Sequence, residues 1–139
     1  MNDGRKYKHQ ARGAKKTVTT IKYFRNSEDA QTFRAGQIVF TEGDPGNMMY
    51  AILEGEVEIM VGDQVVGIIP AGSIVGEMAL IDHSPRSATA VARTECRLVP
   101  IDERRFLFMV QQTPNFSLDV MRIMAARLRD MDALMDSRS

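Results

Sequence analysis

Short apolar runs separated by turn-forming residues fill the middle of this 139-residue chain, between residues 30 and 101. In the run 57–61, valine and isoleucine alternate with Glu58 and Met60, which is the period of two expected of a half-buried strand. Further runs of similar length are bounded by glycine, proline and acidic residues. Seven or eight such strands predict an all-β sandwich or barrel. The further runs are residues 31–34, 38–40, 48–53, 64–69, 87–92 and 97–101.

Beyond residue 101 the apolar residues recur in steps of three and four, which predicts helices. Asp102 is expected to be the N-cap of a first helix, which covers about residues 105–112 and ends at Thr113-Pro114. A second helix is expected to begin near Pro114 or Asn115. Its apolar stripe favours packing, on the barrel or on a partner's helix, over the alternative of a lid that closes over a ligand. The stripe comprises Phe116, Val120, Ile123, Met124, Leu128, Met131, Leu134 and Met135.

The stretch from residue 74 to residue 92 carries the residue types of a site for a small phosphorylated ligand with hydroxyl groups. Gly76 permits a sharp turn, and residues 77–81 suffice for one helical turn whose free N–H groups suit a phosphate oxygen. Arg86 can offer a two-pronged, charged partner to that anion, whereas Glu77 suits a sugar hydroxyl. The plainer alternative is a structural ion pair between Arg86 and Glu77.

These residues resemble the phosphate-binding cassette of cyclic nucleotide-binding domains, where Gly-Glu-aliphatic-Ala-Leu precedes a short loop and Pro-Arg-x-Ala-Thr/Ser. The match uses residues 76–80 and 85–89, ten positions in register within fourteen residues, and is therefore specific. The likeness extends over about residues 30–138. It implies a mainly β fold with flanking helices, namely an eight-stranded jelly-roll sandwich or barrel followed by C-terminal helices.

The resemblance also implies how a cyclic nucleotide is held. Arg86 pairs with the exocyclic phosphate oxygens, Glu77 accepts the ribose 2′-hydroxyl, and the N–H groups of Ala79 and Ser87 complete the phosphate cradle. Threonine at the position of Ser87 is associated with cyclic GMP, whereas alanine, and serine in bacterial receptors, occur with cyclic AMP. We therefore expect cyclic AMP as the ligand, with cyclic GMP as the second candidate. The expected ligand-binding residues are Gly76, Glu77, Met78, Ala79, Arg86, Ser87 and Ala88.

Charge is distributed unevenly along the chain. The first 25 residues contain eight Lys and Arg against the single acid Asp3, although the formal net charge of the whole chain is zero. Residues 1–22 are expected to form a basic arm, and residues 23–139 the binding domain, with the barrel at about 30–101 and helices at about 102–138. The simplest interpretation of the arm is a solvated tail, and the alternatives are contact with nucleic acid or acidic partners and an intramolecular clamp. Family members often have a helix before the first strand, for which residues 17–29 look too short and broken.

Other functions find less support in these residues. The two histidines, His9 in the arm and His83 in the cassette loop, cannot form the histidine cluster of a cupin-type metal enzyme, and no nucleophile or Walker motif is present, so we expect no enzyme. His83 is expected to be solvated. The sequence ends within its amphipathic helix and offers no recognition helix, so sequence-specific DNA binding is not expected. We expect a stand-alone receptor that signals to an effector protein or through a homodimer. The alternative is a ligand-free scaffold or dimerisation module.

The single cysteine, Cys96, excludes an internal disulfide framework and lies in an apolar run, so we expect a buried thiol in a reducing compartment. No apolar run approaches the roughly 20 residues that span a bilayer. The N-terminus also lacks the apolar core of a signal peptide. We therefore expect a cytoplasmic protein that does not contact a membrane.

Overall fold

The computed structural model describes residues 23–138, and describes the side chains as far as residue 133. Within this range, eight strands form two four-stranded antiparallel sheets, in the orders β1-β8-β3-β6 and β2-β7-β4-β5. The strands are β1 (Gln31–Phe33), β2 (Ile38–Phe40), β3 (Met48–Glu54), β4 (Val57–Val61), β5 (Gln64–Ile69), β6 (Ile74–Val75), β7 (Thr89–Ala92) and β8 (Cys96–Asp102). The helices are α2 (Glu77–Asp82), α3 (Glu103–Gln112) and α4 (Asn115–Arg138).

The predicted sandwich with C-terminal helices is confirmed, and the predicted strands match the observed ones to within two residues at either end. The one strand that the periodicity missed is β6, whose two residues lie inside the cassette and are both buried. The predicted N-cap of α3 is also confirmed, because the Asp102 side chain accepts a hydrogen bond of 2.8 Å from the Arg105 N–H. The expected basic arm lies outside the described residues.

Two apolar cores share the central strands β3 and β8. Side chains such as Ile52 and Leu98 pack between the two sheets, whereas Ala51 and Val99 face the helices. Alternate residues of β3 therefore enter different cores, and the strand is apolar on both faces. In the edge strand β5, in contrast, Val65 and Val66 are each about half exposed to solvent.

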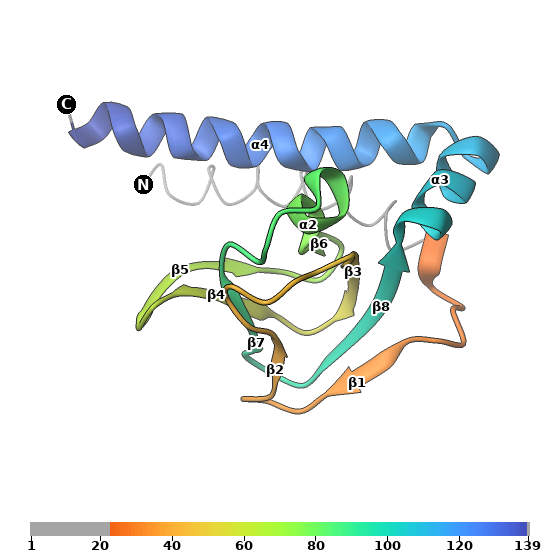
Figure 1. Ribbon diagram of the computed structural model, residues 1–139, viewed down its shortest axis with the longest axis horizontal. Coiled ribbons are helices and arrows are strands. Elements are labelled where there is room, and N and C mark those ends of the chain that lie inside the picture. The colour runs from red at the N-terminus through yellow and green to blue at the C-terminus, as the bar shows by residue number, and fades with distance from the viewer. Residues whose placement is uncertain (1–22, 139) are drawn as a thin grey trace, which may run out of the picture.

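Helix α4 lies across one end of the sandwich, above α2 and β6 (Figure 1). Phe116 and Val120 in its first turns are buried in the core that faces the helices, as the packing interpretation of the apolar stripe predicts. Further along the same stripe, Leu128 and Met131 are 61% exposed. The first half of α4 thus anchors the helix, and the second half presents apolar side chains to solvent. The side chains of Leu134 and Met135 lie outside the described residues.

The segment before β1 is held to this helical core. Tyr23 and Phe24 are helical, and both rings pack edge-on against Phe116, with centroid distances of 5.5 and 5.7 Å. The Arg105 guanidinium donates hydrogen bonds to the Asp29 carboxylate and to the Ser27 hydroxyl. The domain therefore includes residues from at least Tyr23 onward, whereas the rest of the expected N-terminal region, residues 17–22, lies outside the described residues.

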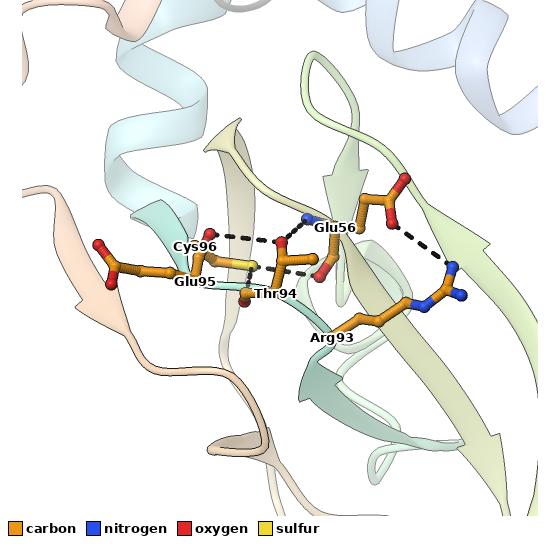
Figure 2. A network of polar contacts seen from close by, with 5 residues as sticks. All are labelled: Glu56, Arg93, Thr94, Glu95 and Cys96. Atoms are coloured by element: carbon orange, nitrogen blue, oxygen red, sulfur yellow. Dashed lines mark hydrogen bonds and ion pairs between the residues drawn. The ribbon is translucent and has the colours of Figure 1, made fainter.

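The turn between β3 and β4 is fixed to the turn between β7 and β8 by a polar network around Cys96 (Figure 2). The buried thiol contacts the carbonyl oxygens of Glu56 and Thr94, both at 3.2 Å, and the Glu56 N–H donates to the Thr94 hydroxyl at 3.1 Å. Burial raises the pKa of the Cys96 thiol, which agrees with a protonated structural cysteine. Gly55 makes this close approach possible, because a Cβ there would lie 2.3 Å from the Glu95 carbonyl oxygen.

We predict that Gly55→Ala lowers the free energy of unfolding by about 1–3 kcal/mol more than Gly36→Ala does, since it adds a backbone clash to the conformational strain. Gly36 is the matched control, because it has the same φ of 89° but no atom within 4 Å of its Cβ position. Urea unfolding of the two variants measures the difference. Equal losses in both variants would contradict the proposed close packing around Gly55.

Candidate functional site

A cavity of about 510 Å³ lies between the cassette, strands β4 and β5, and helix α4. All seven residues selected from the sequence as ligand-binding line this single cavity, although they come from both ends of the cassette. The structure therefore brings the candidate residues together, and their role in binding a ligand stays a prediction. The remaining lining residues, which the sequence analysis did not select, are Phe40, Ile59, Val66, Gly67, Ile69, Val75, Arg127 and Met131.

The predicted helical turn is confirmed as α2, which begins directly after Gly76. Gly76 has a φ of 82°, and a Cβ there would lie 2.7 Å from the Arg86 guanidinium, so both the backbone and the space favour glycine. His83 ends the helix in the left-handed conformation and is exposed, as expected, with its Nε2 3.4 Å from the Glu103 carboxylate. Hydrogen bonds from Ser84 to the Asp82 carboxylate fix the loop that follows and lower the pKa of Asp82.

Arg86 is held by its backbone as well as by its side chain. Its N–H donates to the Asp44 carbonyl and its own carbonyl accepts from the Gly43 N–H, both at 2.8 Å. The turn between β2 and β3 thus fixes the backbone of Arg86 through both its N–H and its carbonyl group. The guanidinium donates to the Gly76 carbonyl at 3.2 Å, and a Cβ on Gly46 would lie 2.3 Å from its Nε.

The positive charge of Arg86 is buried without a carboxylate partner. The residue is only 7% exposed, and among the side chains that the structure describes it forms no ion pair within 4.0 Å. Burial lowers the pKa of Arg86, and the proximity of Tyr50 and Asp44 opposes this only in part. A buried cation with one carbonyl acceptor is costly unless an anion accompanies it. The cavity therefore has the electrostatic character of an anion site.

The alternative of a structural ion pair between Arg86 and Glu77 is wrong. Glu77 instead pairs with Arg127 of α4, with 2.9 Å between Oε1 and Nη1. The same guanidinium donates to the Ser73 hydroxyl at 3.1 Å and to the Ile74 carbonyl. Arg127 therefore ties the second half of α4 to Glu77 in the cavity wall and to β6 and the residue before it.

Arg127 is not among the residues of the predicted apolar stripe, and the sequence analysis assigned it no role. Arg127 lies four residues from both Ile123 and Met131, so it falls on the face of the apolar stripe, and a charged residue on that face was the sequence signal that could have singled it out. Met131, one turn further, was assigned to the stripe and lines the cavity. These two residues show that the later turns of α4 contribute to the wall of the cavity. The alternative of a lid that closes over a ligand stays a prediction.

No three or more His, Cys, Asp or Glu side chains gather into a metal site within residues 23–138. In the same part of the chain, no helix has the length and hydropathy needed to cross a bilayer. The charged side chains that line the cavity are Arg86, Glu77 and Arg127, and most of the other lining residues are apolar.

Comparison with known proteins agrees with this geometry. Residues 30–113 match the family model described as the cyclic nucleotide-binding domain. The chain is 31% identical over 102 residues to a CRP-like cAMP-activated global transcriptional regulator of Mycobacterium tuberculosis, covering 70% of this chain and 46% of the relative. It is 37% identical over 81 residues to a cAMP-dependent protein kinase regulatory subunit of Eremothecium gossypii, covering 58% and 18%.

The fold itself resembles a solved cyclic nucleotide-binding domain from Methylobacillus flagellatus. The TM-score is 0.68 at 26% sequence identity, with 79% of this chain and 67% of the other covered. The chain spans less than half the length of the two curated relatives, so the likeness concerns one domain of those proteins.

We predict that the Glu77–Arg127 pair contributes about 1–2 kcal/mol of coupling to the stability of the ligand-free protein, because both side chains are largely buried. The measurement is a double-mutant cycle of Glu77→Gln and Arg127→Met by urea unfolding. As a control, the exposed pair Arg93–Glu56 should couple by less than about 0.5 kcal/mol. Strictly additive effects at Glu77 and Arg127 would show that the contact contributes nothing to holding α4.

Proposed function

Since the chain belongs to the cyclic nucleotide-binding domain family, we propose that it is a receptor for a cyclic nucleotide, with cyclic AMP as the preferred ligand. The observation that carries the proposal is the buried Arg86 guanidinium, which lines an apolar cavity without a carboxylate partner among the described side chains. A cyclic phosphodiester supplies the single negative charge that this position lacks. The cavity volume also falls within the range of about 300–1,000 Å³ typical of small-molecule sites.

In the proposed complex, Arg86 binds the exocyclic phosphate oxygens with its planar fork. The N–H groups of Ala79 and Ser87 donate to the same phosphate, and both residues line the cavity. Glu77 accepts a hydrogen bond from the ribose 2′-hydroxyl. The apolar side chains of Val66 and Met131 at the cavity wall suit the purine ring.

Two observations bear on the choice of purine. The two curated relatives described above are named for cyclic AMP, which supports the same ligand for this chain. Ser87 keeps cyclic GMP as the second candidate, because its hydroxyl lines the cavity and can accept a hydrogen bond from the guanine amino group.

We further propose that helix α4 transmits the binding signal. Glu77 is both the proposed ribose acceptor and the partner of Arg127, so a ligand that engages Glu77 changes the contact that holds α4. A ligand shifts this equilibrium only by its differential affinity for the two helix positions, and about 1.4 kcal/mol of difference shifts it tenfold. The exposed Leu128, which does not line the cavity, provides an apolar contact for an effector protein or for a second copy of the chain.

A ligand-free scaffold or dimerisation module of the same fold is the alternative function. Only the exposed apolar residues of α4 favour this alternative. It does not explain why the charge of Arg86 is buried without an anionic partner among the described side chains. Contact with DNA or acidic partners through the basic arm concerns residues outside the described range.

We predict that Arg86→Ala weakens cyclic AMP binding at least about thirtyfold, since truncating one member of a buried charge pair typically costs about 2–5 kcal/mol. Arg86→Lys should recover part of the loss, because it restores the charge without the two-pronged geometry. Isothermal titration of the folded variants measures both effects. Arg93→Ala, which removes an exposed arginine, is the control and should bind like the parent. Equal affinities of Arg86→Ala and the parent would remove Arg86 from the phosphate site.

We predict that 2′-deoxy cyclic AMP binds the parent about tenfold to a hundredfold more weakly than cyclic AMP, because a hydrogen bond to a carboxylate is lost. On Glu77→Gln the two ligands should differ by only a few-fold. Competition against a fluorescent cyclic nucleotide gives the four affinities needed. If removing the 2′-hydroxyl weakens binding to Glu77→Gln as much as it weakens binding to the parent, the 2′-hydroxyl is recognised by another residue.

A further inference from the structure

Phe40 of β2 lies outside the cassette and contacts Arg86. The guanidinium carbon of Arg86 lies 4.1 Å from the centroid of the Phe40 ring, within the range of a cation–π interaction. The ring is half-buried and lines the cavity together with Arg86. The described side chains provide no carboxylate within ion-pair distance of Arg86, so this aromatic face is a direct favourable contact of its side chain, together with the Gly76 carbonyl.

The Phe40 ring is itself fixed in place by its neighbours. It stacks on Tyr50 of β3, with 6.3 Å between centroids and 25° between planes, and Tyr50 in turn packs edge-on against Phe33 at 6.5 Å. Phe40 and Tyr50 belong to different sheets, so this row of rings crosses the sandwich. Phe40 also approaches Gly76, where a Cβ would lie 3.1 Å from the ring. Neighbouring residues therefore restrict the position of the ring that the guanidinium contacts.

We propose that Phe40 is the positioning residue for Arg86: its ring holds the guanidinium at the phosphate site before any ligand arrives. An aromatic ring suits this task better than a carboxylate would. A carboxylate would have to be displaced by the incoming phosphate, or would repel it, whereas the quadrupole of a ring stabilises the cation and leaves its hydrogen-bond donors free. Pre-organisation of this kind raises affinity by reducing the ordering that binding requires.

The binding readout of this inference rests on the proposed function. Replacing Phe40 with mono-, di- and trifluorophenylalanine keeps the shape of the ring and progressively weakens its negative face. We expect the dissociation constant for cyclic AMP to rise with each fluorine, and Phe40→Leu to raise it about threefold to thirtyfold in total. Phe40→Tyr, which keeps the ring, should retain more affinity than Phe40→Leu. A dissociation constant that does not change across the fluorinated series would overturn the proposal.

Two controls separate positioning from packing. Phe33→Leu makes the same chemical change two rings away from Arg86, so it should reduce stability and leave the affinity within about twofold, well below the loss expected from a desolvated cation–π contact. In an Arg86→Ala background, Phe40→Leu should have no further effect on binding. An equal loss of affinity in Phe33→Leu, or an undiminished effect of Phe40→Leu without Arg86, would show that the ring acts through packing alone.

A second measurement needs no nucleotide. In the ligand-free protein, the order parameter of the Arg86 Nε–H group, measured by nitrogen-15 relaxation, should fall in Phe40→Leu and stay high in Phe33→Leu. An unchanged order parameter in Phe40→Leu would overturn the positioning role. If the parent protein binds no cyclic nucleotide, the proposed function fails, and this measurement still decides whether Phe40 orders Arg86.

Discussion

The burial of one positive charge, that of Arg86, is the constraint on which the cavity depends. A guanidinium removed from water without an anionic partner is costly, and the surrounding structure is arranged to tolerate it. The turn between β2 and β3 fixes its backbone, the Gly76 carbonyl accepts one of its hydrogen bonds, and Gly46 leaves room for its side chain. Arg86 is thus positioned for an anion. Because its buried charge has no anionic partner in the ligand-free protein, a ligand that supplies one gains binding free energy.

Helix α4 connects this charge to the rest of the molecule. Its first turns are part of the hydrophobic core through Phe116, whereas its later turns reach the cavity through Arg127 and carry the exposed Leu128 and Met131. The later turns depend on a few polar contacts at the cavity wall, and so require less free energy to move than the buried first turns. A helix with one anchored half and one half held by the binding site is suited to carry a signal outward.

The sequence indicated a candidate site only where its residues are close together along the chain. The glycine, the helical turn and Pro85-Arg86 lie within one short stretch, and their spacing alone indicated an anion site with a hydroxyl acceptor. Arg127 and Phe40 escaped prediction because the fold brings them to the cavity from about 40 residues away on either side. Strand β6 was missed for a different reason: two residues are too few for a period of two to be visible. The strands, the Asp102 cap and the two C-terminal helices were predictable, since local patterns determine them.

The central claim is that a cyclic nucleotide occupies the cavity beside Arg86. Isothermal titration of the full chain with cyclic AMP, cyclic GMP and linear 5′-AMP tests it most directly, because linear AMP shares the base and ribose and lacks the cyclic phosphodiester. The account predicts saturable binding of cyclic AMP, weaker binding of cyclic GMP and weaker binding still of linear AMP. No heat and no rise in melting temperature with either cyclic nucleotide, from protein shown to be folded, would contradict it and favour the scaffold.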